Sequence, residues 1–130
     1  MKTLADSLRK VVAVRLDERA SGHLADALAA RGVLVERMRD MPGRRKLAEA
    51  DALLLDMRAG GASEKIEKAR GKPALVAVPA EAPLHEERFA QRQLVDTVTS
   101  DAPGWLGVLR LNNLVAHARR TAGAGPPERE

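Results

Sequence analysis

The segment that most constrains the fold is residues 51–56 (DALLLD), in which four apolar residues lie between two carboxylates. A short apolar run followed by two glycines is typical of a strand that is buried on both faces of a parallel sheet. Such a strand carries Asp56 to its C-terminal end. Ligands and chemistry are found at that edge of open α/β sheets, so Asp56 is the first candidate for a functional residue.

Four further runs of strand length, rich in Val, Leu and Ala, alternate with helical segments. We predict strands at 10–16, 33–35, 74–78 and 94–98, and helices near 18–31, 46–50, 64–70, 84–92 and 104–120. Strands that alternate with helices over short connections predict a parallel sheet covered on both faces. The expected fold is therefore α/β: a three-layer, doubly wound sheet of five parallel strands in the flavodoxin-like order 2-1-3-4-5.

The chain is expected to form one domain over residues 9–121, out of 130 in all. Residues 122–130 (AGAGPPERE) have the composition of a linker, so we expect a disordered tail or an interdomain linker there.

Composition narrows the function classes. The 22 basic residues are interspersed with 18 acidic ones, and aromatic residues make up 2% of the chain, which disfavours nucleic-acid binding. No apolar run approaches the roughly 20 residues of a membrane span. The absence of cysteine fits a cytoplasmic protein. The three histidines lack the spacing of metal ligands, so no metal is expected.

The order and spacing of these segments resemble the receiver domain of bacterial response regulators, over residues 9–120. Residues 10–14 (KVVAV), 50–56 (ADALLLD) and 72–78 (KPALVAV) are similar to the first, third and fourth strands of that family. The resemblance implies that Asp56 occupies the position of the phosphoacceptor aspartate. It also implies a place in two-component signalling or a phosphorelay.

Several positions depart from the family pattern. The family has an acidic pair after the first strand that holds Mg²⁺, but this chain has Arg15 and Leu16 there. Magnesium requires oxygen ligands, which these side chains do not supply. Asp17, one residue further on, is either a displaced ligand or the cap of the following helix. We expect the Arg15 guanidinium to pair with Asp56.

The switch positions of the family are also substituted. Pro79 stands where the family has Ser or Thr, Thr97 replaces an aromatic residue, and Ser100 or Ala102 replaces an invariant Lys. Phosphoryl transfer depends on positioning and charge neutralisation. Losing two contributions of about 3 kcal/mol each would slow it roughly 10⁴-fold. We therefore expect a degenerate pseudo-receiver that is not an enzyme, is phosphorylated weakly or not at all, and needs no cofactor.

The last helix has more apolar residues than one core-facing stripe needs. Trp105, Leu106 and Leu109 are candidates for an interface, although a single Trp is also a common core residue. The expected partner is another protein, such as a histidine kinase, a diguanylate cyclase or another signalling domain, or a second copy of the chain. The expected role is a protein-interaction or dimerisation module.

Two alternatives remain. The first is a sensor of a small signalling nucleotide such as cyclic di-GMP, whose phosphates would meet exposed arginines: Arg37, Arg39, Arg44, Arg45 and Arg58. The second is a small enzyme that uses Asp17 and Asp56 as a carboxylate pair.

Overall fold

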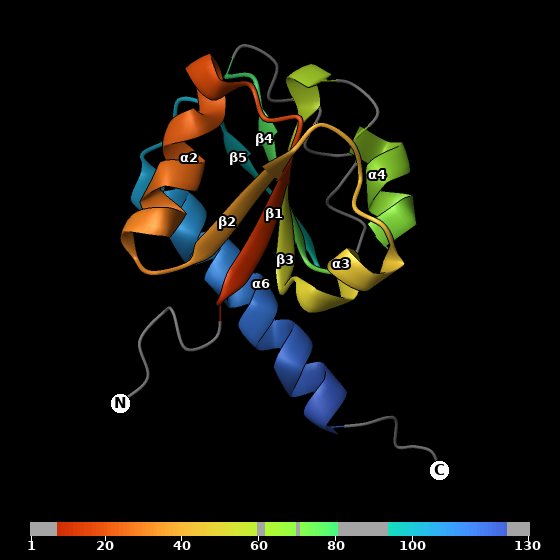
Figure 1. Ribbon diagram of the computed structural model, residues 1–130. Helices are drawn as coiled ribbons and strands as arrows, with labels where there is room; N and C mark the ends of the chain where they lie inside the picture. The colour runs from red at the N-terminus through yellow and green to blue at the C-terminus, as the bar shows by residue number, and fades with distance from the viewer. Residues whose placement is uncertain (1–7, 60–61, 70, 81–93, 125–130) are drawn as a thin grey trace.

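Five parallel strands form a single sheet in the computed structural model, which describes residues 8–59, 62–69, 71–80 and 94–124 (Figure 1). The strands are β1 (Lys10–Val14), β2 (Leu34–Met38), β3 (Ala52–Asp56), β4 (Ala74–Val78) and β5 (Val95–Thr99). Their spatial order is β2-β1-β3-β4-β5. Every residue of β3 and β4 is buried, as expected for central strands covered on both faces. The predicted fold class and strand order are confirmed.

Helices cover both faces of the sheet. They are α2 (Glu18–Ala30), α3 (Arg44–Glu49), the short 3-10 helix η1 (Met57–Ala59), α4 (Ala62–Ala69) and α6 (Gly104–Ala124). Figure 1 shows α2 and α6 on one face and α3 and α4 on the other. The predicted helical segment at 84–92 lies outside the described residues. No helix within the described ranges is long and apolar enough to cross a membrane.

The sheet separates two apolar clusters. The first lies between the sheet and helices α2 and α6, and includes Leu24, Leu54 and Leu111. The second lies on the side of α3 and α4, and includes Leu53 and Leu55. Adjacent residues of β3 thus point to opposite faces, which explains why residues 51–56 show no polar alternation.

The ends of the domain differ slightly from the predicted boundary of 9–121. Leu8, one residue before that boundary, is fully buried in the first cluster. At the other end α6 continues to Ala124, so its last three residues belong to the range 122–130 that was expected as a tail. The C-terminal turns of α6 extend past the edge of the sheet where the strands begin (Figure 1). Residues 125–130 lie outside the described part of the chain.

The first carboxylate of residues 51–56 has a structural role. Oδ2 of Asp51 accepts hydrogen bonds from the backbone N–H groups of Arg9, at 2.8 Å, and Lys10, at 3.0 Å. Nη2 of Arg119 on α6 lies 3.2 Å from Oδ1 of the same carboxylate. Asp51 therefore joins the start of β1 to the last helix, at the edge opposite to Asp56.

Candidate functional site

The candidate site lies at the edge of the sheet where the strands end. Asp56 is the last residue of β3 and pairs with Ala77 of β4. Ser100 follows β5, and its backbone N–H donates to the carbonyl of Val78 at 2.7 Å. Arg15 directly follows β1. The residues predicted from the receiver resemblance thus do lie at the ends of neighbouring strands, as the parallel topology requires.

The Asp56 carboxylate is buried, and each of its oxygens accepts a hydrogen bond from a backbone N–H. The residue is 2% exposed. Oδ2 accepts from the backbone N–H of Asp17 at 2.9 Å, and Oδ1 accepts from that of Arg58 at 3.0 Å. Backbone N–H donors favour a buried carboxylate because they replace the water it has lost. Asp56 therefore fastens the β1–α2 connection and η1 to the end of β3.

Asp17 caps α2. Its Oδ1 accepts from the backbone N–H of Arg19, at 3.1 Å, and from that of Ala20, at 3.2 Å. This is the usual arrangement of an Asp N-cap, and it confirms the capping alternative. Asp17 contacts Asp56 through its backbone N–H. The contact therefore joins a backbone donor to a carboxylate and does not bring two carboxylates together. The arrangement gives no support to a catalytic pair at these positions.

The prediction of an ion pair between Arg15 and Asp56 is wrong. Arg15 is exposed, and no ion pair joins it to Asp56 among the residues that the structure describes. Its backbone has a φ of 51°, and its N–H donates to the carbonyl of Met38 at 2.7 Å. The turn after β1 is thus fixed by its backbone, while both Asp56 oxygens already have N–H donors. Leu16 is partly buried and packs against the first cluster.

The residues at this edge do not fit the Mg²⁺ that the receiver resemblance would imply. Arg15 and Leu16 offer no oxygen side chain, and Asp17 uses Oδ1 to cap α2. No three His, Asp or Glu side chains in the described ranges gather in a way that could hold a metal ion. A hard cation needs several oxygen ligands together, and the described side chains at this edge do not provide such a set.

The substituted switch positions lie where the topology predicts. Thr97 and Ser100 are 6% and 5% exposed, and Pro79 directly follows β4. The backbone N–H of Thr97 donates to Oδ1 of Asp96 at 2.8 Å, and its carbonyl accepts from Nη1 of Arg110. Side chains thus form hydrogen bonds with backbone groups of the edge strand β5, which protects this strand against pairing with another strand. Neither Ser100 nor Ala102 carries the charge of the lysine that the family has here.

The apolar surface of α6 is smaller than predicted. Trp105 is 57% exposed and Leu109 is 40% exposed, so Trp105 is not a core residue. Leu106, in contrast, is partly buried and packs against the first cluster. The candidate interface is therefore reduced to Trp105 and Leu109, four residues apart on one side of the helix.

The arginines named for a nucleotide sensor lie in different surroundings. Arg37 binds Oε2 of Glu18 at 2.8 Å and Oδ1 of Asp26 at 3.1 Å. The bond to Glu18 is the main cause that raises the pKa of Arg37 above its ordinary value, and Asp26 adds to it against the effect of desolvation. Arg37 is thus occupied by carboxylates of its own chain. Arg44, in contrast, faces a cavity between α3 and α4.

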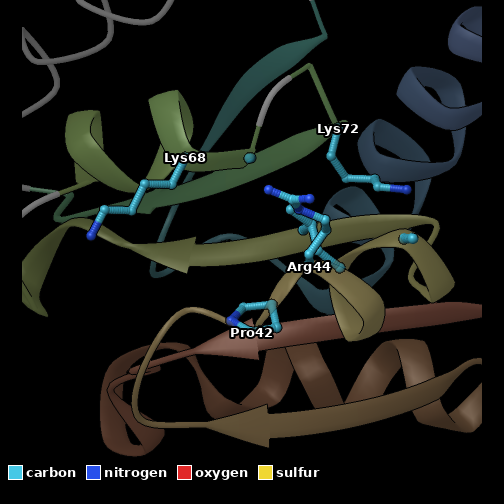
Figure 2. A pocket seen from close by; sticks show the side chains of 7 residues that line it. Pro42, Arg44, Lys68 and Lys72 are labelled. Atoms are coloured by element: carbon cyan, nitrogen blue, oxygen red, sulfur yellow. The ribbon is translucent and has the colours of Figure 1, made fainter.

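That cavity was not predicted from the sequence. It has a volume of about 490 Å³ and lies between α3, α4 and the segment that joins α4 to β4. Figure 2 shows Arg44 reaching from α3 towards α4, with Lys68 on one side and Lys72 on the other. Pro42, Leu47 and Ala69 supply apolar surface. Lys68 and Lys72 are four residues apart, but Arg44 lies on another helix, so the sequence carries no signal that the cavity brings it near them.

A group of charged residues links β1, β2 and α3. Nζ of Lys46 lies 2.5 Å from Oε2 of Glu36, and Nζ of Lys10 lies 3.8 Å from Oε1. The hydrogen bond from Lys46 is the main cause that lowers the pKa of Glu36 below its ordinary value of 4.5. Partial desolvation opposes this effect, and the charges of Lys46 and Lys10 add to the lowering.

A pH-dependent contribution of Glu36 to stability follows. Because the pKa is lower in the folded state, the stabilisation is fully present above the ordinary value of 4.5 and is lost as the pH falls below it. We expect Glu36→Gln to lower the free energy of unfolding at neutral pH, with a difference from wild type that shrinks as the pH falls below 4.5 and through the lowered pKa of the folded state. Urea unfolding at several pH values measures this. A difference that stays constant down to the lowest pH would contradict it.

Comparison with known proteins gives structural likeness only. Neither family models nor curated proteins show a match to this chain. A solved structure described as a fusion with the trimeric coiled coil of yeast Spc42 aligns with a TM-score of 0.66 and 15% identity, covering 90% of this chain and 85% of that chain. A flavodoxin from Streptococcus pneumonia TIGR4 aligns with a TM-score of 0.38 and 14% identity, covering 88% and 99%. The first of these supports the fold and carries no information on function.

Proposed function

We propose that this chain is a degenerate receiver domain that works as a protein-interaction or dimerisation module in bacterial signalling. The five-stranded parallel sheet is consistent with a receiver, and Asp56 lies at the end of β3, as the phosphoacceptor of that family does. The chemistry around Asp56 supports a domain that has kept the shape and lost the phosphorylation reaction. Its carboxylate binds backbone N–H groups, and among the described residues it belongs to no group of acidic side chains that could hold Mg²⁺.

The exposed pair of Trp105 and Leu109 is the observation that carries the interaction role. Large apolar side chains on the same side of a helix cost free energy when they stay in water. Trp is also the residue type most enriched among those that dominate binding energy. Both residues lie on the first turns of α6, close to the edge of the sheet that holds Asp56. A partner signalling domain or a second copy would cover this surface.

Substitution of Trp105 tests the proposal. We expect Trp105→Ala to weaken self-association, or binding to a cognate histidine kinase or diguanylate cyclase, by at least about tenfold, because truncating a central Trp typically costs 2 kcal/mol or more. Sedimentation equilibrium measures the dissociation constant of a dimer of this chain. Titration with the partner measures the dissociation constant of the complex with a kinase or cyclase. Leu34→Ala is the control: Leu34 is 63% exposed at the start of β2, at the opposite edge of the sheet. An equal effect of both variants, or none of Trp105→Ala, would contradict the proposed surface.

A further inference from the structure

Three basic residues line the cavity between α3 and α4. They are Arg44, Lys68 and Lys72, and no acidic side chain is among the described residues that form its wall. A volume of about 490 Å³ lies within the range of small-molecule sites. The cavity is therefore large enough for a ligand of nucleotide size and has the charge to attract an anion.

The three cations lack carboxylate partners in the part of the chain that is described. Other basic side chains of the domain are engaged: Lys10 and Lys46 with Glu36, Arg37 with Glu18. Arg44, Lys68 and Lys72, by comparison, form no ion pair among the described residues. An anion bound in the cavity would therefore not compete with a carboxylate of this part of the chain for these cations.

The arrangement of the charges indicates the kind of anion. Figure 2 shows Lys68 and Lys72 extending in opposite directions, away from Arg44, which lies between them, so the three charged groups are well separated. A ligand with several phosphate groups can contact such a row, whereas a single inorganic phosphate cannot reach all three. A guanidinium also suits phosphate, because it can donate two parallel hydrogen bonds.

The rest of the wall is apolar. Pro42, Leu47 and Ala69 offer surface against which a flat ring can pack. We propose that this cavity binds a nucleotide with two or more phosphates, with the phosphates at Arg44 and the lysines and the base against the apolar wall. This site is separate from Asp56 and from the α6 surface, so it goes beyond the proposed interaction role and does not depend on it.

Calorimetric titration of the full chain with ATP tests the proposal, with tripolyphosphate and adenosine as the two halves of the ligand. We expect ATP to bind at least about tenfold more tightly than either half. Arg44→Gln and Lys72→Gln should each weaken ATP binding by about fivefold or more. Arg45→Gln is the matched control, because it removes the same charge from the adjacent exposed position, which does not line the cavity. It should change the dissociation constant less than about twofold.

Three results would overturn the proposal. The first is an absence of saturable ATP binding up to about 5 mM. The second is tripolyphosphate binding as tight as that of ATP, which would show attraction of charge without recognition of the nucleoside. The third is an equal loss in Arg45→Gln and Arg44→Gln, which would place the binding outside the cavity. Trp105→Ala should leave ATP binding unchanged, so this test and that of the interaction surface fail or succeed separately.

Discussion

Replacing Asp56 by Ala is expected to lower the free energy of unfolding by roughly 3 kcal/mol, since it leaves two part-buried backbone donors without their acceptor. The carboxylate is 2% exposed and accepts from the N–H groups of Asp17 and Arg58. An alanine at this position cannot bind either group, and the buried location restricts water from replacing the lost oxygens. Urea unfolding of the isolated chain measures the change.

Two variants make this result interpretable. Asp101→Ala removes a carboxylate from an exposed position beyond β5 and should alter stability by less than about 0.5 kcal/mol. Asp56→Asn keeps one acceptor oxygen and should fall between wild type and Asp56→Ala. If Asp56→Ala were as stable as wild type, or more stable, the carboxylate would not be a structural anchor, and a functional reason for its burial would be required.

The second large effect is expected at Leu54, in the middle of β3. Leu54 is fully buried in the first cluster, between the sheet and helices α2 and α6. Leu54→Ala should lower the free energy of unfolding by about 3 kcal/mol, because removing buried methyl groups loses transfer free energy and leaves a cavity. The same substitution at Leu34, which is 63% exposed, should cost less than about 0.5 kcal/mol. Equal losses at the two positions would contradict the assignment of residues 51–56 to the central buried strand.

The fold could be predicted because its strongest signals are local. The apolar run of β3 and its partner in β4 indicate central parallel strands, and their burial on both faces agrees with this. The first and last residues of the domain were harder to predict from the sequence. Leu8 lies in the core although charged residues follow it, and α6 continues through small residues that resemble a linker. Tertiary packing decides such ends, and composition does not reveal it.

The site was predictable in position but not in its contacts. Parallel topology places the ends of β1, β3 and β5 at one edge, so Arg15, Asp56 and Ser100 were correctly located there. The predicted ion pair between Arg15 and Asp56 was wrong because the donors to Asp56 are backbone N–H groups, which no side-chain pattern reveals. The cavity beside Arg44 was missed for a different reason. Its lysines come from α4 and the segment after it, and only the folded chain brings them near α3.

The most direct measurement is the reaction of the chain with acetyl phosphate in the presence and absence of Mg²⁺, followed by intact mass and by mapping of any modified residue. With no group of three metal-binding carboxylates or histidines at this edge in the described ranges, and with Ser100 or Ala102 in place of the lysine after β5, we expect a rate roughly 10⁴-fold below that of an intact receiver, and therefore no Mg²⁺-dependent phosphoryl adduct. Mg²⁺-dependent labelling that maps to Asp56 and disappears in Asp56→Asn would show that the edge still performs phosphoryl transfer, and would contradict a purely structural role for this carboxylate.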